Sequence, residues 1–150
     1  MPFIKVYVHF VWSTKNRAQT LNTPELRQNV WQHIRENAKK KDLFIDFVNG
    51  HAEHCHCLVS LGVDQTISKV MQPIKGESAF WFNKQGSSKQ KLEWQDEYFA
   101  VSVSDPIAIG SQIEMVRNYI KNQEEHHKHK TFQQEYDEFI INYGFKKFAD

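Results

Sequence analysis

The 150-residue chain is poor in the residue types that mark secreted or membrane proteins. It has only two cysteines, Cys55 and Cys57, and side chains at positions i and i+2 of a strand run parallel, so they cannot readily form a disulfide. No apolar run approaches the ~20 residues that a membrane span requires, and no secretory signal opens the chain. We therefore expect a cytoplasmic protein with reduced thiols and no membrane association.

The chain also has no marked excess of charge of either sign. Its net charge is +1, so any nucleic-acid surface must be a local basic patch rather than a general basic field. The composition, 40% hydrophobic and 25% charged, is that of an ordinary globular protein and argues against disorder. The length and the absence of a linker or repeat predict a single domain over residues 1–150.

The order of strand and helix patterns predicts an α+β fold. Strand patterns occupy residues 3–12, 43–50, 54–61 and 97–104, and helix patterns occupy residues 25–41, 66–84, 113–130 and 131–144. Pro73 should bend the helix over 66–84 or mark its first stretch, because proline removes a backbone donor. The order is the β-α-β-β-α-β arrangement of ferredoxin-like (RRM-like) folds, an antiparallel sheet with helices on one face and a C-terminal helical addition.

Histidines and both cysteines crowd one predicted strand, in "HAEHCHCLVSL". Side chains alternate along a strand, so His54 and His56 share one face while Cys55 and Cys57 take the other, against the helix-covered core. This alternation argues against a structural zinc site that uses histidines and cysteines together. Two imidazoles about 7 Å apart on an open sheet face can chelate a divalent ion with a third ligand. The alternative is a pair of half-exposed strand residues without a ligand.

A second group of histidines lies in "EEHHKHK", at His126, His127 and His129. The composition is that of a metal site, but a solvated helix end explains it more simply, because cationic side chains are favoured near a helix C-terminus. His51 is interpreted as a turn residue beside the Asn49–Gly50 turn signal.

Tyr119 and Gln123 are four residues apart, which puts them on one face of the predicted helix over 113–130. They could be a simple surface pair. However, Gln123 offers a neutral oxygen ligand suited to Mg²⁺ or Mn²⁺ beside two imidazoles, and Tyr119 would then lie one turn from the metal. A tyrosine hydroxyl with a pKa near 10 is a poor nucleophile, so it needs an electrophile that a metal activates, such as a phosphodiester.

These residues carry a family resemblance. His54-Cys55-His56 resembles the His-hydrophobic-His motif of the HUH endonucleases, and with "NYIKNQEEHHK" it resembles the single-tyrosine HUH transposases, which include IS200-type and REP-associated tyrosine transposases. Stretches that agree further are "VHFVWSTKNR", "MQPIKGESAFWFN", "WQDEYFAVSVS" and "FQQEYDEFIINYG". The departures are small: cysteines stand at 55 and 57 where aliphatic residues are commoner, and Glu53 where Asp or Asn often precedes the pair.

The resemblance implies a mechanism. Tyr119 would attack a phosphodiester of single-stranded DNA and form a 5′-phosphotyrosine link, while His54, His56 and Gln123 would hold Mg²⁺ or Mn²⁺ on the scissile phosphate. It also implies a homodimer that recognises hairpins at element ends, in a bacterial cytoplasm and associated with the nucleoid when bound to DNA. The alternative is a domesticated module of the same fold that binds hairpin DNA or RNA and does not cleave it.

The DNA surface is predicted from basic residues with interleaved tryptophans. We expect Lys15, Arg17 and Lys75 to contact DNA, because lysine and arginine bind phosphates and aromatic rings stack on unpaired bases. The alternative is that these side chains are ordinary solvated residues of the surface.

Overall fold

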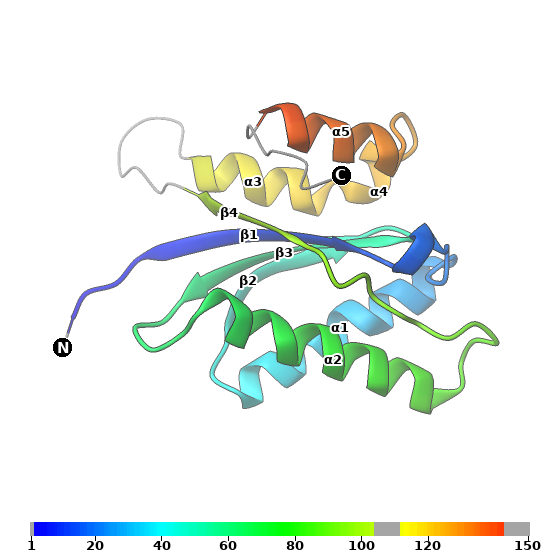
Figure 1. Ribbon diagram of the computed structural model, residues 1–150, viewed down its shortest axis with the longest axis horizontal. Coiled ribbons are helices and arrows are strands. Elements are labelled where there is room, and N and C mark those ends of the chain that lie inside the picture. The colour runs from blue at the N-terminus through cyan, green and yellow to red at the C-terminus, as the bar shows by residue number, and fades with distance from the viewer. Residues whose placement is uncertain (1, 104–111, 143–150) are drawn as a thin grey trace.

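A four-stranded antiparallel sheet forms the middle layer of the computed structural model, which describes residues 2–103 and 112–142 (Figure 1). The strand order is β2-β3-β1-β4, and the strands are β1 (Val6–Ser13), β2 (Phe44–Gly50), β3 (His54–Leu61) and β4 (Phe99–Val103). The element order confirms the predicted β-α-β-β-α-β arrangement. The last residue of the strand pattern, 104, and the last two of the final helix pattern, 143–144, lie outside the described residues.

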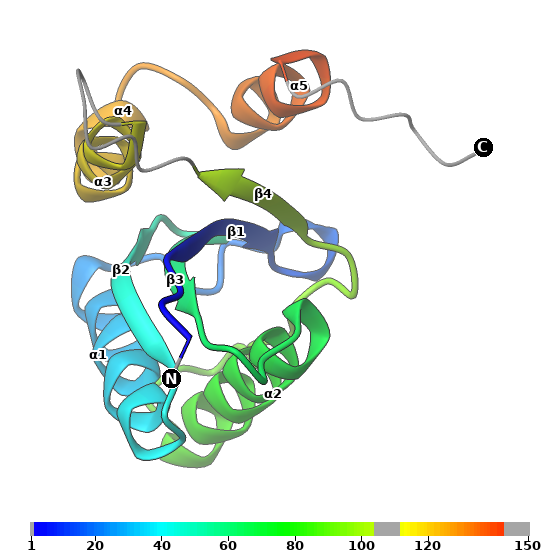
Figure 2. The same cartoon turned by 90° about the vertical axis from the view of Figure 1, so that its left-hand side faces the viewer.

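Two helices cover one face of this sheet, α1 (Pro24–Lys40) and α2 (Ile67–Gln85), as Figure 2 shows end-on. Each begins at a threonine whose side chain accepts a backbone N–H: Thr23 caps α1 and Thr66 caps α2. The α2 helix continues through Pro73 to Gln85. The core between these helices and the sheet contains Phe10, Trp12, Val30, Ile34, Cys55, Cys57, Val70 and Ile74, among others.

The other face of the sheet is covered as well, by α3 (Gln112–Lys121), α4 (Gln123–His126) and α5 (Phe132–Asn142) (Figures 1 and 2). Phe132 and Phe139 of α5 pack on Val11 of β1, while Ile113 and Ile120 of α3 pack with Leu58. The open sheet face expected beside His54 and His56 is therefore a buried layer. The C-terminal addition builds it because its helices carry their own apolar stripes.

The expected single helix over 113–130 is wrong, because the chain breaks at Asn122 between α3 and α4. In a continuous helix the carbonyls of residues 119–121 would accept N–H groups four residues on. Here the Tyr119 carbonyl accepts the side-chain amide of Gln123 at 3.2 Å, and those of Ile120 and Lys121 accept Asn49 Nδ2 at 2.9 and 3.2 Å. A residue of β2 thus ends the helix that carries Tyr119.

Two arginines tie this layer to the rest of the fold. Arg117 of α3 donates to both carboxylate oxygens of Asp46 in β2, at 2.9 and 2.6 Å. Arg27 of α1 binds Glu124 of α4 and also donates to the Leu21 carbonyl at 2.9 Å. Planar guanidinium groups suit such paired contacts. No helix within residues 2–103 and 112–142 is long and apolar enough to cross a membrane.

Candidate active site

The alternation of β3 divides histidines from cysteines as predicted. His54 and His56 face α3–α5 and are fully buried, whereas Cys55 and Cys57 lie in the core beneath α1 and α2. Burial raises the pKa of Cys57 to about 12 and that of Cys55 well above its ordinary value, so both thiols stay protonated. Protonated thiols on the far face do not complete a zinc site with the histidines.

A glycine allows the tight connection that starts β3. Gly50 ends β2 so close to the next strand that a Cβ added there would lie 2.2 Å from the His54 carbonyl oxygen. The same carbonyl accepts the His51 N–H at 3.0 Å. His51 lies in this connection, as predicted, and its ring stacks on His127 with 5.3 Å between centroids. The turn signal therefore fixes where the histidine pair begins.

His54 is held by groups on both sides of its ring. Its Nδ1 lies 2.7 Å from Glu53 Oε1, and its Nε2 lies 3.0 Å from Gln123 Oε1. A carboxylate beside Nδ1 makes that nitrogen a proton donor, so Nε2 is the ring nitrogen that faces Gln123. Gln123 is fully buried, and its own Nε2 donates to the Tyr119 carbonyl, which leaves Oε1 turned toward His54. The structure thus brings together two predicted ligands 69 positions apart.

The His56 ring contacts one side chain of β1 and one of α5. Its Nδ1 lies 2.9 Å from Nε2 of His9, and its Nε2 lies 2.7 Å from Oε1 of Glu135. Burial, and then the His56 imidazole, lower the pKa of His9 to about 3, and burial also lowers the pKa of His56 against the opposing effect of Glu135. Burial alone would raise the pKa of Glu135, but the surrounding imidazoles, His56 first, hold it well below its ordinary value.

Tyr119 lies in the last turn of α3, with its ring edge-on to His56 at 5.4 Å and to His126 at 5.1 Å between centroids. Burial, reinforced by the negative charge of Glu135, raises the pKa of Tyr119. The phenol is therefore protonated in this arrangement. The four residues predicted from the motifs, Tyr119, His54, His56 and Gln123, come together beneath α5.

Sequence reasoning missed four members of this cluster, His9, His126, His127 and Glu135. Glu135 is 1% exposed, and His126 and His127 lie against it, so the interpretation of "EEHHKHK" as a solvated helix end is wrong for these two histidines. His129 is exposed, as that interpretation requires. A signal for Glu135 was present, because it lies three and four residues from Phe132 and Phe139 and so on the apolar stripe of α5. The signal for His126 and His127 was the metal-like composition of "EEHHKHK".

The donor set fits a divalent cation. One ligand atom each from His54, His56 and Glu135 can be chosen so that all lie within 4.8 Å of one another, and Gln123 adds an amide oxygen. Imidazole nitrogens with carboxylate and amide oxygens suit ions such as Mn²⁺, and Mg²⁺ prefers the oxygens. His54 Nε2 and Gln123 Oε1 lie 3.0 Å apart, close enough for both to bind one cation.

Of the three expected DNA contacts, the structure brings one beside this cluster. The Arg17 guanidinium lies over the rings of Phe132 and Tyr136 at 5.4 and 4.9 Å, and the Phe132 ring stacks on His54 at 4.2 Å. Lys15, two residues earlier in a 3₁₀ turn, is exposed and lies 3.6 Å from Glu93.

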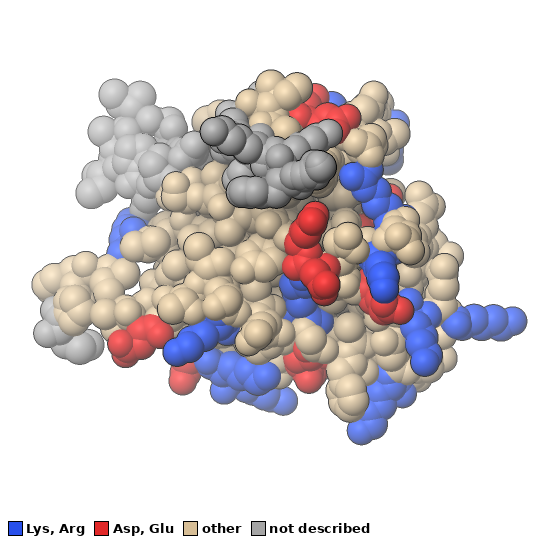
Figure 3. All heavy atoms as spheres, in the orientation of Figure 1, with Lys and Arg blue, Asp and Glu red and all other residues tan. Residues whose placement is uncertain are grey.

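Lys75 lies on α2, across the sheet from the histidines, and its ammonium donates to the carbonyls of Gln95 and Asp96. Figure 3 shows basic side chains mainly along the lower and right-hand parts of one face, with acidic ones scattered among them. DNA contact by Lys15, Arg17 and Lys75 stays a prediction.

Comparison with known proteins adds the family. The sequence model of the family described as "Transposase IS200 like" matches residues 3–123. The chain belongs to the IS200-like transposase family. The matched residues of this transposase include Tyr119, His54, His56 and Gln123 but end before α5. A search of curated protein sequences found no match.

Solved structures show the same fold. A candidate transposase from Deinococcus radiodurans R1 is 23% identical, with a TM-score of 0.64 over 81% of this chain and 93% of that one. A REP-associated tyrosine transposase bound to a REP hairpin is 20% identical, with a TM-score of 0.52 over 80% of this chain and 66% of that one. The α+β fold predicted from the sequence is confirmed.

Proposed function

We propose that this IS200-like transposase cleaves and rejoins single-stranded DNA with Tyr119 as the nucleophile, and that His54, His56 and Gln123 hold Mg²⁺ or Mn²⁺. The observation that carries the proposal is the convergence of these four side chains, from β3 and from the break between α3 and α4, although 69 positions separate His54 from Gln123. A nucleophile beside a cation-binding cluster is the arrangement that phosphoryl transfer requires.

The chemistry is two transesterifications. The Tyr119 oxygen attacks the scissile phosphorus, the P–O3′ bond breaks, and the products are a 5′-phosphotyrosine and a free 3′-hydroxyl. A basic group beside the phenol accepts its proton, which the raised pKa of Tyr119 makes necessary, and the proton is delivered to the departing 3′-oxygen. The 3′-hydroxyl of another cleaved strand then attacks the phosphotyrosine, and Tyr119 takes its proton back. Each step exchanges one phosphate ester for another, so no external energy source is needed.

The buried cluster orients the reacting groups. Glu53 holds the tautomer of His54, and Asn49 ends α3 where Tyr119 meets His56. A divalent cation bound there would supply positive charge beside the scissile phosphate. Preorganised groups cost no reorganisation during the reaction, which supports a role in catalysis rather than in folding alone.

The DNA substrate and the oligomeric state belong to the same proposal. A hairpin-bearing strand is the proposed substrate, supported by the similarity to the transposase solved with a REP hairpin. Arg17 and Lys15 would bind its phosphates at the end of the sheet nearest His54. We further propose a homodimer, as the family resemblance implies.

The decisive experiment is the trapping of a covalent protein–DNA adduct. Wild-type protein with Mg²⁺ or Mn²⁺ should form an adduct with a single-stranded hairpin oligonucleotide but not with duplex DNA. Tyr119→Phe should form none, because it lacks the attacking oxygen, and should still bind the hairpin. Tyr98→Phe removes a hydroxyl from a tyrosine that packs against the core on the opposite side of the sheet, and it should behave as wild type.

Two results would contradict the proposal. Adduct formation by Tyr119→Phe would show that another residue is the nucleophile. Hairpin binding by the wild type without any adduct would instead support the non-cleaving binding module.

A further inference from the structure

His126 and His127 lie outside the ligand set of the proposed function, yet both approach the buried carboxylate of Glu135. We propose that His126, His127 and Glu135 form a second site for a divalent transition-metal ion, and that Glu135 bridges it to the cation held by His54 and His56. The bridge rests on the proposed function, whereas the second site is assigned from its own residues.

The Glu135 carboxylate faces two pairs of histidines. Its Oε1 lies 2.7 Å from His56 Nε2 and 3.7 Å from His54 Nε2. Its Oε2 lies 3.1 Å from Nε2 of His126 and 3.1 Å from Nε2 of His127. One oxygen thus serves each pair, which is the geometry of a bridging carboxylate.

Two of these atoms have no hydrogen-bond partner in the part of the chain that the structure describes. Glu135 Oε2 and His126 Nε2 are both buried and make no hydrogen bond of regular geometry, although they are 3.1 Å apart. Burial of a carboxylate oxygen without a well-formed hydrogen bond is costly, and Glu135 is 1% exposed. A bound cation would satisfy the oxygen and the nitrogen together.

The orientation of His127 points to the same conclusion. Its Nδ1 lies 2.8 Å from the Lys130 carbonyl and donates to it. This contact turns Nε2 toward Glu135 Oε2 at 3.1 Å and Gln123 Oε1 at 3.0 Å. The three atoms are therefore placed to act as ligands of one cation. A backbone carbonyl that orients a histidine in this way is typical of metal ligands.

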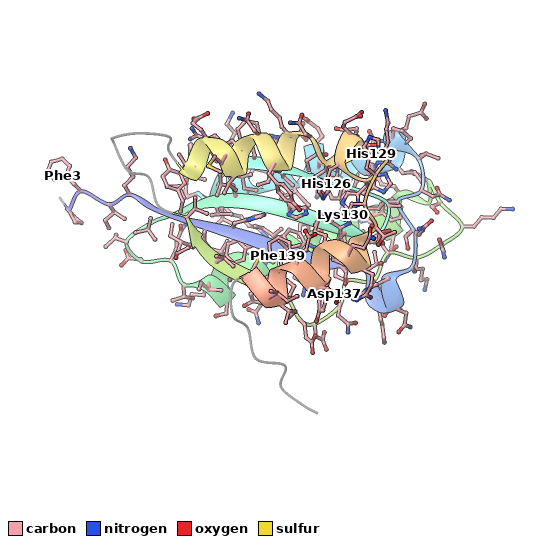
Figure 4. All side chains as sticks on the ribbon, turned by 90° about the horizontal axis from the view of Figure 1, so that it is seen from above. Phe3, His126, His129, Lys130, Asp137 and Phe139 are labelled. Carbon is pink, nitrogen blue, oxygen red and sulfur yellow. The ribbon has the colours of Figure 1, made fainter. Side chains whose placement is uncertain are left out.

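Two imidazoles and one carboxylate are a ligand set for divalent transition metals, with positions left for water or substrate. His126 is the last residue of α4, and His127 follows it directly. Figure 4 shows His126 between α3–α4 and α5. The His126 ring also contacts the Tyr119 ring. The second ion would therefore lie on the side of the nucleophile, where two-metal phosphoryl-transfer sites hold the attacking oxygen.

Titration with Mn²⁺ alone tests the proposal, because Mn²⁺ binds stray surface histidines weakly. Metal-free protein is titrated, bound ions are counted from the electron paramagnetic resonance of free Mn²⁺, and the bound spectrum is examined for exchange coupling. Wild type should bind two ions per chain with a coupled spectrum. The double variant His126→Ala/His127→Ala should bind one ion, uncoupled. Glu135→Gln, nearly isosteric, should lose the coupling.

His129→Ala is the matched control, since His129 is an exposed histidine two residues further on, and it should bind two coupled ions. Circular dichroism of the metal-free variants verifies folding. One ion in the wild type, two in the double variant, or two uncoupled ions in the wild type would each overturn the proposal. One ion with normal adduct formation leaves the proposed function standing, whereas two coupled ions without adduct overturn that function and leave the second site.

Discussion

A single carboxylate, that of Glu53, determines which ring nitrogen of His54 is available to bind a metal. Glu53 Oε1 lies 2.7 Å from His54 Nδ1, and the Glu53 side chain is mostly buried. Burial alone would raise the pKa of Glu53, but the hydrogen bond and charge of His54 lower it below its ordinary value, so Glu53 is ionised at neutral pH. An anionic acceptor on Nδ1 makes Nε2 a better electron donor toward a metal.

Glu53→Ala should weaken Mn²⁺ binding by about 10–100-fold, the cost expected when a partner behind a metal-binding histidine is lost. Glu53→Gln keeps an acceptor for the Nδ1 proton and should lose less. Glu25→Gln, at an exposed position in the first turn of α1, is the control. Titration of metal-free protein measures all three, and wild-type affinity in Glu53→Ala would contradict the role given to Glu53.

The faces of His54 and His56 could be predicted from the sequence because strand alternation is a local property that depends only on neighbouring residues. The apolar stripe of α5 indicates that Glu135 is buried, but it does not predict the contact with His56, because 79 positions separate the two residues and no local pattern records that contact. The same holds for His126, whose Nε2 faces Glu135 rather than water.

At the scale of elements, the position of Tyr119 depends on where α3 ends. Asn49 Nδ2 donates to the carbonyls of Ile120 and Lys121, so β2 and α3 share a cap made by a side chain rather than by the helix itself. The α4 helix then starts at Gln123. The placement of Tyr119 and Gln123 therefore depends on Asn49, a residue outside the histidine cluster.

Asn49→Ala should lower the free energy of unfolding by about 1–3 kcal/mol, because it leaves the carbonyls of Ile120 and Lys121 without their amide donor. It should also lower the yield of the Tyr119 adduct, since the turn between Tyr119 and Gln123 loses its cap. Urea unfolding and adduct trapping measure the two effects. Asn29→Ala, on the exposed side of α1, should change neither, and an unaltered unfolding midpoint in Asn49→Ala would contradict the cap.

The amphipathic pattern predicted that α5 would form, since Phe132 and Phe139 mark its apolar stripe. It could not predict that this stripe would cover the histidine face of the sheet, because a stripe shows which side is buried but not against what. The break at Asn122 could not be predicted for a similar reason, because it depends on a side chain of β2, Asn49.

For the whole molecule, acid should lower the free energy of unfolding by protonating histidines that are neutral in the fold. Burial is the main cause that lowers the pKa of four of them, His9, His51, His56 and His126. Each of these rings takes up a proton more readily in the unfolded chain than in the folded one. The three-layer packing around the sheet is responsible, since it removes water from both faces.

The free energy of unfolding should therefore be nearly constant between pH 7 and about 8 and should fall as the pH drops below 6.5. It should also fall above about pH 9, where the thiols of Cys55 and Cys57 ionise in the unfolded chain but stay protonated in the fold. Between 6.5, the ordinary value, and about 3, its pKa in the fold, His9 is protonated when unfolded and neutral when folded. It alone contributes a loss of up to about 1.4 kcal/mol per pH unit. Urea unfolding of metal-free protein across this range measures the slope, which His9→Gln should reduce. Stability that rises on acidification would contradict the burial of neutral histidines.

The contact between His56 and Glu135 joins residues far apart in the chain, and this affects the kinetics of folding. Contacts between residues close in sequence form early, whereas closing a 79-residue loop carries a larger entropic cost. The β2–β3 hairpin and the α1 contacts beside it can form before α5 docks. Metal affinity that depends on Glu135 should then recover after the β2–β3 hairpin has formed, so the bound ion would report a late step of assembly.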